Sequence, residues 1–229
     1  MNNKFDGICA VIAPVGLADA EFSEDSAQHR RRTSVLGSTA KRGCDVAVAI
    51  LALPVVMIVA LGLFLANPLW NPGPVLFRQT RMGRHCRPFT AFKFRTMREC
   101  RSATRGPHDP VEHERITPLG RFLRRSRIDE IPQFINILKG DMSLIGPRPD
   151  FWDHAVHFID SVPGYQARHA VKPGITGLAQ VHLGYAEGLE ATFKKVRYDL
   201  EYIRTMSLSL ELHVLWRTVI VVTTGFGAR

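Results

Sequence analysis

The sequence predicts a mostly helical α+β protein that is attached to one face of a membrane. Three observations support this fold class: a long uncharged apolar segment, short strand-like segments after it, and helical periodicity in the second half. At 229 residues the chain is long enough to bury one core and to carry an additional terminal arm. We therefore expect a single folded domain beside one membrane element.

The apolar segment Val46–Leu65 contains no charged side chain and has about the ~20 residues that a helix needs to cross a bilayer. A buried core helix is the alternative, but few soluble helices are apolar on every side. Basic residues flank the segment on both sides: Lys41 and Arg42 before it, and Arg78, Arg81, Arg84 and Arg87 after it. Such residues favour the cytoplasmic side, and Pro54 disrupts the helix near its midpoint. We therefore predict a re-entrant membrane helix over residues 39–70, broken at Pro54.

The rest of the chain divides into an arm and a domain. Residues 1–38 mix glycine, alanine, serine and charges without periodicity, and we predict a flexible cytosolic arm there. Residues 71–229 are predicted to form a cytosolic domain that lies on the membrane face. Its predicted elements are a small β element with strands at Val75–Phe77 and Phe89–Phe94, helices at Leu119–Arg125 and Ile131–Gly140, and amphipathic helices at Leu189–Ile203 and Leu208–Thr224. The last of these suits an interfacial helix better than a second span, because three polar residues interrupt it.

The charge balance indicates an anionic partner. The formal net charge is +9 and the isoelectric point is near 9.8, which suits nucleic acid, phospholipid headgroups or a phosphorylated substrate. The four cysteines stand far apart without a C-x-x-C motif, so a metal site built from thiols is not expected.

Two adjacent carboxylates, Asp129 and Glu130, lie in a stretch rich in arginine. An ionised aspartate can attack phosphorus and form an acyl phosphate, and Mg²⁺ takes carboxylate and phosphate oxygens together. The pair precedes a turn opened by Pro132, so we expect the helix N-terminus to keep a carboxylate ionised. The structural alternative is that both residues are helix-start acids paired with the nearby arginines.

Two glycine- and proline-rich segments follow the acid pair. In Gly146–Pro149 two prolines hold the backbone around Arg148, which suits bidentate binding of phosphate; a rigid surface turn is the alternative. In Lys172–Gly177 the glycines permit close approach of the backbone to a ligand, although the spacing is not that of a P-loop.

Taken together, the motifs resemble the bacterial sugar transferases, which are monotopic polyprenyl-phosphate phosphoglycosyl transferases. The matching segments are Lys41-Arg42 with Asp45, Gly73-Pro74-Val75-Leu76-Phe77-Arg78-Gln79, Lys93-Phe94-Arg95-Thr96-Met97, Ile128-Asp129-Glu130-Ile131-Pro132-Gln133, Leu138-Lys139-Gly140-Asp141-Met142-Ser143, Gly146-Pro147-Arg148-Pro149 and Pro173-Gly174-Ile175-Thr176-Gly177. They run in family order from about residue 41 to the C-terminus.

The resemblance implies transfer of a sugar-1-phosphate from a UDP-sugar to polyprenyl phosphate at the cytosolic face of the cytoplasmic membrane. It implies Asp129 as the nucleophile with Glu130 beside it, and Mg²⁺ held by both. The residues implied in phosphate or substrate binding are Arg124, Arg148, Lys93, Arg95 and Gln133, and Pro54 is implied in the membrane kink. Many family members have a serine before that proline, where this chain has Leu53.

Two other function classes follow from the residues alone. A nucleic-acid-binding module would explain the positive charge, but it leaves the apolar segment unexplained and no nucleic-acid motif is present, so nucleic acid is not an expected partner. A non-catalytic membrane anchor of a polysaccharide assembly complex would not need the carboxylates. Membrane lipids are expected partners whether the protein is a transferase or a membrane anchor. A homodimer is compatible with the sequence.

Overall fold

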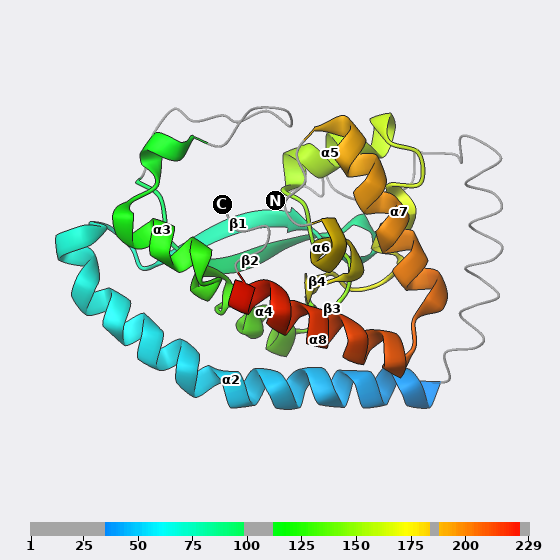
Figure 1. The fold of residues 1–229 in the computed structure, drawn as a ribbon, viewed down its shortest axis with the longest axis horizontal. Helices are drawn as coiled ribbons and strands as arrows, with labels where there is room; N and C mark the ends of the chain where they lie inside the picture. Colours follow the sequence, from blue (N-terminus) through cyan, green and yellow to red (C-terminus); the bar gives the residue numbers. More distant parts are fainter. Residues whose placement is uncertain (1–34, 99–111, 184–187, 225–229) are drawn as a thin grey trace, which may run out of the picture.

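The computed structural model describes residues 35–98, 112–183 and 188–224. The fold is mostly helical, with two small sheets packed among the helices (Figure 1). This agrees with the predicted α+β class. The predicted arm at residues 1–38 lies almost entirely outside the described residues.

The longest element is the apolar helix α2, Val35–Trp70. It begins four residues before the predicted boundary at residue 39. Figure 1 shows that α2 bends near its middle and that the rest of the domain lies on its concave side. Pro54 lies inside this helix, and a proline both removes a helical hydrogen bond and clashes with the preceding turn. The bend therefore has a local cause, and the chain continues as a helix on both sides of it.

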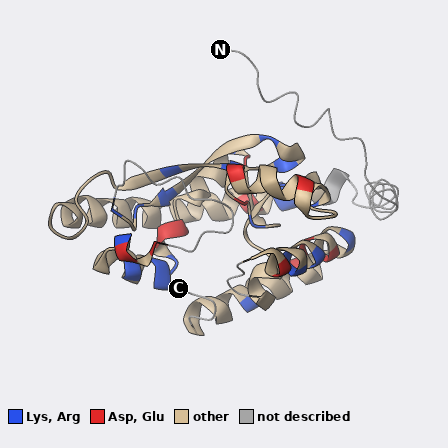
Figure 2. Cartoon of the chain, turned by 90° about the horizontal axis from the view of Figure 1, so that it is seen from above, with Lys and Arg blue, Asp and Glu red and all other residues tan. Residues whose placement is uncertain are grey.

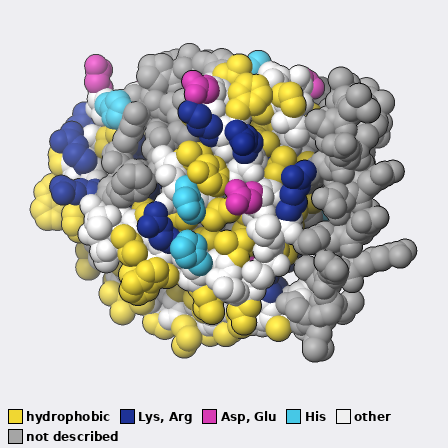
Figure 3. Space-filling model, turned by 45° about the vertical axis from the view of Figure 1, so that its right-hand side comes forward, with side chains coloured by type: hydrophobic (Ala, Val, Ile, Leu, Met, Phe, Trp, Pro, Cys, Tyr) yellow, Lys and Arg dark blue, Asp and Glu magenta, His cyan; other side chains and the backbone are white. Residues whose placement is uncertain are grey.

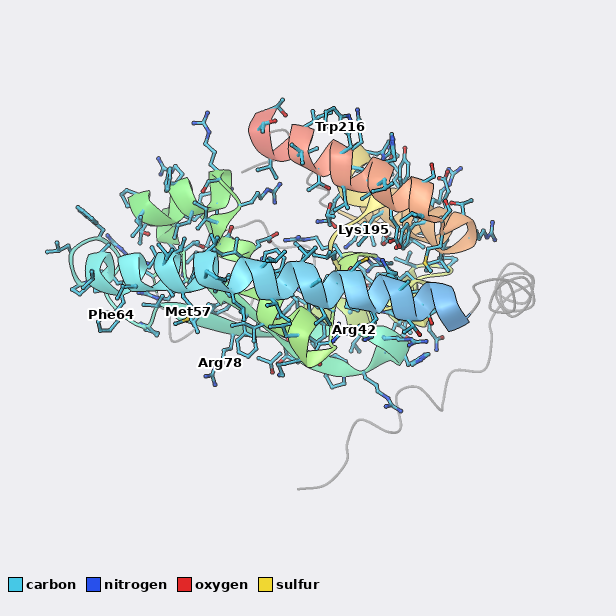
Figure 4. The ribbon with its side chains drawn as sticks, turned by 90° about the horizontal axis from the view of Figure 1, so that it is seen from below. Arg42, Met57, Phe64, Arg78, Lys195 and Trp216 are labelled. Carbon is cyan, nitrogen blue, oxygen red and sulfur yellow. The ribbon has the colours of Figure 1, made fainter. Side chains whose placement is uncertain are left out.

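Helix α2 exposes a continuous apolar surface. Within the described residues it is the one helix that is long and apolar enough to cross a membrane. Its outward side chains include Leu51, Met57, Ile58, Phe64, Leu65 and Leu69, each at least 66% exposed. Figure 4 looks onto this face and labels Met57 and Phe64. Burying such a surface in lipid removes a large unfavourable contact with water.

Two small sheets connect the helices. Strand β1, Leu76–Met82, pairs antiparallel with β2, Pro88–Phe94, in a register that joins Leu76 to Phe94. The first strand is longer than predicted because polar and charged side chains fill Arg78–Arg81 before the buried Met82, which hides the apolar pattern. The second sheet pairs β3, Ser143–Ile145, in parallel with β4, Gly174–Thr176, and was not predicted.

The predicted helices are all present. They are α3 (Pro118–Arg125), α4 (Gln133–Lys139), α7 (Leu189–Thr205) and α8 (Leu208–Thr224), joined by α5 (Trp152–Ser161), α6 (Leu178–Leu183) and the 3-10 turns His113–Arg115, Ile128–Glu130 and Gln166–Ala170. The hydroxyl of Thr117 caps α3 by accepting a hydrogen bond from the Gly120 amide. Gly140 ends α4 in the left-handed conformation, with φ +88°.

Apolar packing joins α2 to the part of the chain that carries the acid pair. Val56 and Leu63 of α2 form a cluster with Phe94 and Leu123, and Ile128 and Ile131 pack against that cluster. The 3-10 turn Ile128–Glu130 is therefore held against the membrane-facing helix by the residues that flank Asp129 and Glu130.

Helix α8 shares a face of the molecule with α2 (Figures 1 and 4). The Lys41 ammonium of α2 donates to Glu211 of α8 at 2.6 Å, and the Tyr202 hydroxyl donates to the same carboxylate at 3.1 Å. The exposed apolar side chains of α8 include Leu208, Leu212, Trp216 and Val219. In Figure 3 hydrophobic side chains gather along the lower edge, where α2 and α8 lie, and the charged side chains lie above them.

Charged residues of both signs are mixed on the described part of the chain. In Figure 2 lysine and arginine are spread over several elements and interspersed with aspartate and glutamate.

Candidate active site

Asp129 and Glu130 lie in the 3-10 turn Ile128–Glu130 between α3 and α4, and each is 8% exposed. Arg127 precedes the turn in the left-handed region, with φ +58°. This conformation is uncommon for a residue with a side chain, and here it reverses the chain between α3 and the acid pair. The carboxylates are thus placed by a strained turn and by the apolar packing of Ile128 and Ile131.

Glu130 is paired with two cations. Its Oε1 accepts hydrogen bonds from Lys93 Nζ at 2.6 Å and from Arg148 Nη2, and its Oε2 accepts one from Arg148 Nη1 at 3.0 Å. Burial by itself raises the pKa of Glu130, but Arg148 and Lys93 outweigh burial and hold that pKa well below its usual value. The structural alternative for this residue, an ion pair with an arginine, is therefore present in the structure.

Asp129 differs from Glu130 in its hydrogen bonding and in its pKa. Within the described part of the chain no group donates a hydrogen bond to its carboxylate. Burial and the charge of Glu130 raise the pKa of Asp129 to about 6, while Lys93, Arg148 and Arg124 oppose the rise. Burial is the largest influence on this pKa and acts against the ionised form, and stabilisation by the helix N-terminus stays a prediction. At pH 7 about nine-tenths of Asp129 is still ionised, so it is a carboxylate available for attack.

The other predicted binding residues separate into two groups. Lys93 lies beside Glu130, and burial lowers its pKa to about 8. Arg124 donates from Nε to the Thr96 hydroxyl at 2.9 Å and is close enough to lower the pKa of Asp129. Gln133 is buried at the start of α4. Lys93, Arg124 and Arg148 therefore gather around the acid pair, and a binding role for Gln133 stays a prediction.

Arg95 belongs to the second group. Arg95 is 5% exposed, and its guanidinium donates to the main-chain carbonyls of Asn71, Pro74 and Met97. These contacts hold the segment after α2 and do not support the prediction that Arg95 binds phosphate. Strand β2 ends at Phe94, so the alternation that orients Lys93 does not continue to Arg95.

A second buried network lies behind Arg148 and was not predicted. Arg168 is 1% exposed and donates to the Arg148 carbonyl at 2.7 Å and to Asp199 at 2.8 Å. Asp150 accepts hydrogen bonds from Arg168, from Lys195 and, at 2.6 Å, from the Tyr165 hydroxyl. Burial alone raises the pKa of Asp150, but Lys195 and Arg168 reverse the effect and lower it far below its usual value. This network fixes the backbone that presents Arg148.

The glycines of Lys172–Gly177 serve a different purpose from the predicted one. A Cβ on Gly174 would lie 2.2 Å from the Gly146 nitrogen, and a Cβ on Gly177 would lie 2.3 Å from the Gly146 oxygen. The Gly174 amide donates to the Pro147 carbonyl at 3.0 Å. The close approach is therefore between two segments of this chain, and it supports the loop that carries Arg148.

The donor set was tested for the predicted Mg²⁺. No cluster of three or more histidine, cysteine or acidic side chains occurs in the described ranges. Both Glu130 oxygens are taken by cations, so Glu130 does not fit as a metal ligand in this arrangement. The Asp129 carboxylate does fit, because Mg²⁺ is often bound through one or two carboxylates together with water and substrate phosphates.

The fold and the site define a class of protein: a membrane-associated protein with a buried carboxylate pair set among cations that suit phosphate. Comparison with known proteins specifies the class. A family model described as bacterial sugar transferase matches residues 36–225, and the chain belongs to this family.

Several curated relatives are similar to the chain. It is 42% identical over 190 residues to a UDP-N-acetylgalactosamine-undecaprenyl-phosphate N-acetylgalactosaminephosphotransferase of Aeromonas hydrophila, covering 82% of this chain and 45% of the relative. It is 41% identical over 181 residues to a UDP-glucose:undecaprenyl-phosphate glucose-1-phosphate transferase of Escherichia coli K12, covering 78% and 39%. The exopolysaccharide production protein PSS of Rhizobium leguminosarum is 36% identical over 198 residues, covering 82% and 97%. The chain spans less than half the length of the first two.

Proposed function

We propose that this protein transfers a sugar-1-phosphate from a UDP-sugar to polyprenyl phosphate and thereby initiates synthesis of an exopolysaccharide or another glycoconjugate. The observation that carries the proposal is the buried Asp129 carboxylate, which is ionised at neutral pH and lies among Lys93, Arg124 and Arg148. Relatives named for UDP-sugar:undecaprenyl-phosphate transfer support the substrate classes.

The proposed reaction has two steps at one phosphorus atom. An Asp129 oxygen attacks the β-phosphorus of the UDP-sugar, the bond to the α-phosphate oxygen breaks, and UMP leaves with the electron pair. A phosphate oxygen of polyprenyl phosphate then attacks the same phosphorus and the bond to Asp129 breaks. The product is the polyprenyl diphosphate sugar, and the Asp129 carboxylate is restored. Lys93, Arg124 and Arg148 offset the phosphate charge in both steps.

Mg²⁺ is part of the proposal as a bound cofactor. Asp129 and the diphosphate oxygens would hold it, and when bound it supplies positive charge to the phosphate groups. Glu130 would join the metal only after releasing Lys93 or Arg148.

The proposed location is the cytosolic face of the cytoplasmic membrane, with α2 entering and leaving on the same side. The bend in α2 and the basic residues on both sides of its apolar surface support this topology. Single cysteines in place of Thr39 or Trp70, in a background without native cysteines, test it with a membrane-impermeant maleimide. Both ends should react in inside-out vesicles and neither in intact cells; a straight span would expose one end on each side.

The covalent step is tested with the variant Asp129→Asn. Membranes that contain the wild-type protein should release UMP from a UDP-sugar and form a labelled lipid, and trapped protein should carry the phosphosugar. The Asp129→Asn variant should lose all three signals. Asp160→Asn on the exposed side of α5 is the matched control and should keep them. Normal turnover by Asp129→Asn would exclude the covalent route, and a panel of labelled UDP-sugars identifies the sugar.

A further inference from the structure

Outside the candidate active site, basic side chains from different elements converge on the turn after α4. A Cβ placed on Gly140 would lie 3.7 Å from Arg42 Nη2 and 3.7 Å from Lys172 Nζ, and apart from the chain neighbours Lys139 and Asp141 no other described residue comes within 4 Å of it. Arg42 comes from the start of α2, and Lys172 comes from the segment before β4. The space above Gly140 is thus open and bordered by two cations.

Arg42 is held in place without being neutralised. Its Nη1 donates to the Ile137 carbonyl at 2.7 Å and its Nη2 donates to the Leu138 carbonyl at 3.2 Å. These carbonyls lie at the C-terminal end of α4, where a positive charge is favourable. The guanidinium is therefore fixed by uncharged acceptors, and its full charge remains available to a ligand.

Lys172 has no hydrogen bond or ion pair to the described part of the chain. Burial and then the charges of Arg42 and Arg84 lower the pKa of Lys172, and Asp45 and Asp141 only partly oppose them. Asp45 is occupied by the Leu144 amide at 3.1 Å, and Asp141 accepts a hydrogen bond from Asn136 at 3.3 Å. Cations that repel one another in a fixed arrangement are stabilised when an anion binds between them.

The Lys172 segment is rigid. The Pro173 carbonyl accepts a hydrogen bond from the Ser143 amide at 2.9 Å, and the Gly174 amide donates to Pro147. The backbone that carries Lys172 is therefore set by the parallel pair β3–β4, and a ligand would have to order only the lysine side chain and not a loop.

The position of Arg42 and Lys172 relative to the apolar surface of α2 indicates that the anion comes from a membrane lipid. Among the α2 residues whose burial is described, Val48 is the first large exposed apolar residue. It lies six positions after Arg42, which is about 9 Å along a helix. The headgroup region of one leaflet is about 5–8 Å thick. Because 9 Å exceeds this thickness along the membrane normal, Arg42 reaches the level of lipid phosphates when the first half of α2 is inclined to the normal, as a bent helix that enters and leaves on one side requires. Lys172 lies beside Arg42 at Gly140 and is then at the same level.

We propose that Arg42, Lys172 and the open turn at Gly140 form a binding site for the phosphate of an anionic phospholipid. Arg84 lies close enough to add to its positive charge. The bound headgroup would fix the first turn of α2 on an anionic membrane surface. The site shares no residue with the acid pair, so it does not depend on the proposed transferase activity.

The test uses the full chain in detergent, with short-chain phosphatidylglycerol added below its micelle concentration and unfolding followed by tryptophan fluorescence. Phosphatidylglycerol should raise the midpoint temperature Tm, as a ligand that binds the folded state does, and the equivalent phosphatidylcholine should not. Lys172→Gln should weaken the apparent affinity about fivefold, because a basic residue near an anionic surface contributes ~1 kcal/mol. Lys172→Arg should bind as the wild type does.

Lys194→Gln is the matched control, because Lys194 is 58% exposed and paired with Glu190 on α7; it should bind as the wild type does. The Tm of each variant without lipid shows whether it is folded. Equal shifts with both lipids, or equal phosphatidylglycerol binding by Lys172→Gln and the wild type, would overturn the proposal. An equal shift with inorganic phosphate at the same concentration would also overturn it, since the site would then bind free phosphate.

Discussion

The attack of Asp129 on the UDP-sugar, which releases UMP, should depend on pH because Asp129 and Lys93 both titrate near neutral pH. Burial and Glu130 raise the pKa of Asp129 to about 6, and burial lowers the pKa of Lys93 to about 8. Attack requires the Asp129 carboxylate, and charge offset requires the Lys93 ammonium. The rate of UMP release should therefore be highest between about pH 6 and pH 8 and should fall on both sides.

The size of the fall follows from the two pKa values. At pH 5 about one-tenth of Asp129 is ionised, so the rate should be about a tenth of its value at pH 7. The informative perturbation is Lys93→Met. This variant should abolish the fall in rate at high pH (the basic limb), because that fall reflects loss of the Lys93 charge. It should also move the fall at low pH (the acid limb) to higher pH, because Lys93 is the strongest influence that lowers the pKa of Asp129. Loss of a charge-assisted hydrogen bond costs about 1.5–3 kcal/mol, or about ten- to a hundredfold in rate at the optimum.

The assay is single-turnover release of UMP from a UDP-sugar without the lipid acceptor, between pH 5 and pH 9 at constant ionic strength. Lys194→Met is the control, because this exposed lysine lies on α7, and its profile should match the wild type. A wild-type rate that is equal at pH 5 and pH 7 would refute the assignment of Asp129. A basic limb that persists in Lys93→Met would refute the assignment of Lys93.

Three further predictions concern the surroundings of the site. Asp150→Asn should lower the transfer rate without moving the acid limb of its pH profile, because Asp150 holds the backbone of Arg148 and not the reacting atoms; a shifted limb would contradict a positioning role. Gly174→Ala should lower stability by about 1–3 kcal/mol, measured by denaturant unfolding, because the new methyl group meets the Gly146 backbone; an unchanged midpoint would contradict the close packing. Arg95→Met should lower the Tm but leave the apparent KM for the UDP-sugar unchanged in folded protein, and a raised KM would restore the phosphate-binding role.

The elements that the sequence predicted well have local signals. Helix α4 has a proline before its first turn and a glycine at its end, and α7 has apolar residues at helical spacing. The acid pair and Arg148 were predicted as site residues because proline and glycine around them make short recognisable segments. Whether each carboxylate is free or paired was left open, because a short segment does not show which cation reaches which carboxylate.

The network behind Arg148 could not be predicted in the same way. Asp150 is 18 residues from Arg168 and 45 residues from Lys195, and no local pattern joins residues at such separations. The signal that could have found it is weaker: Asp150 directly follows the Gly146–Pro149 segment, and an acid in a basic chain requires a partner when it is buried.

The pairing of Glu130 explains why two adjacent carboxylates are useful here. A single buried acid beside Lys93 and Arg148 would form the ion pairs itself, and its oxygens would be unavailable for attack on phosphorus. Glu130 takes both cations and leaves Asp129 without a hydrogen bond from the described residues. Asp129 still experiences the positive charge of Lys93, Arg148 and Arg124. The three cations exceed the two carboxylates by one charge, so the arrangement attracts a diphosphate. Because the Arg148 fork suits phosphate as well as carboxylate, exchange of Glu130 for substrate phosphate would carry the substrate towards the unpaired Asp129.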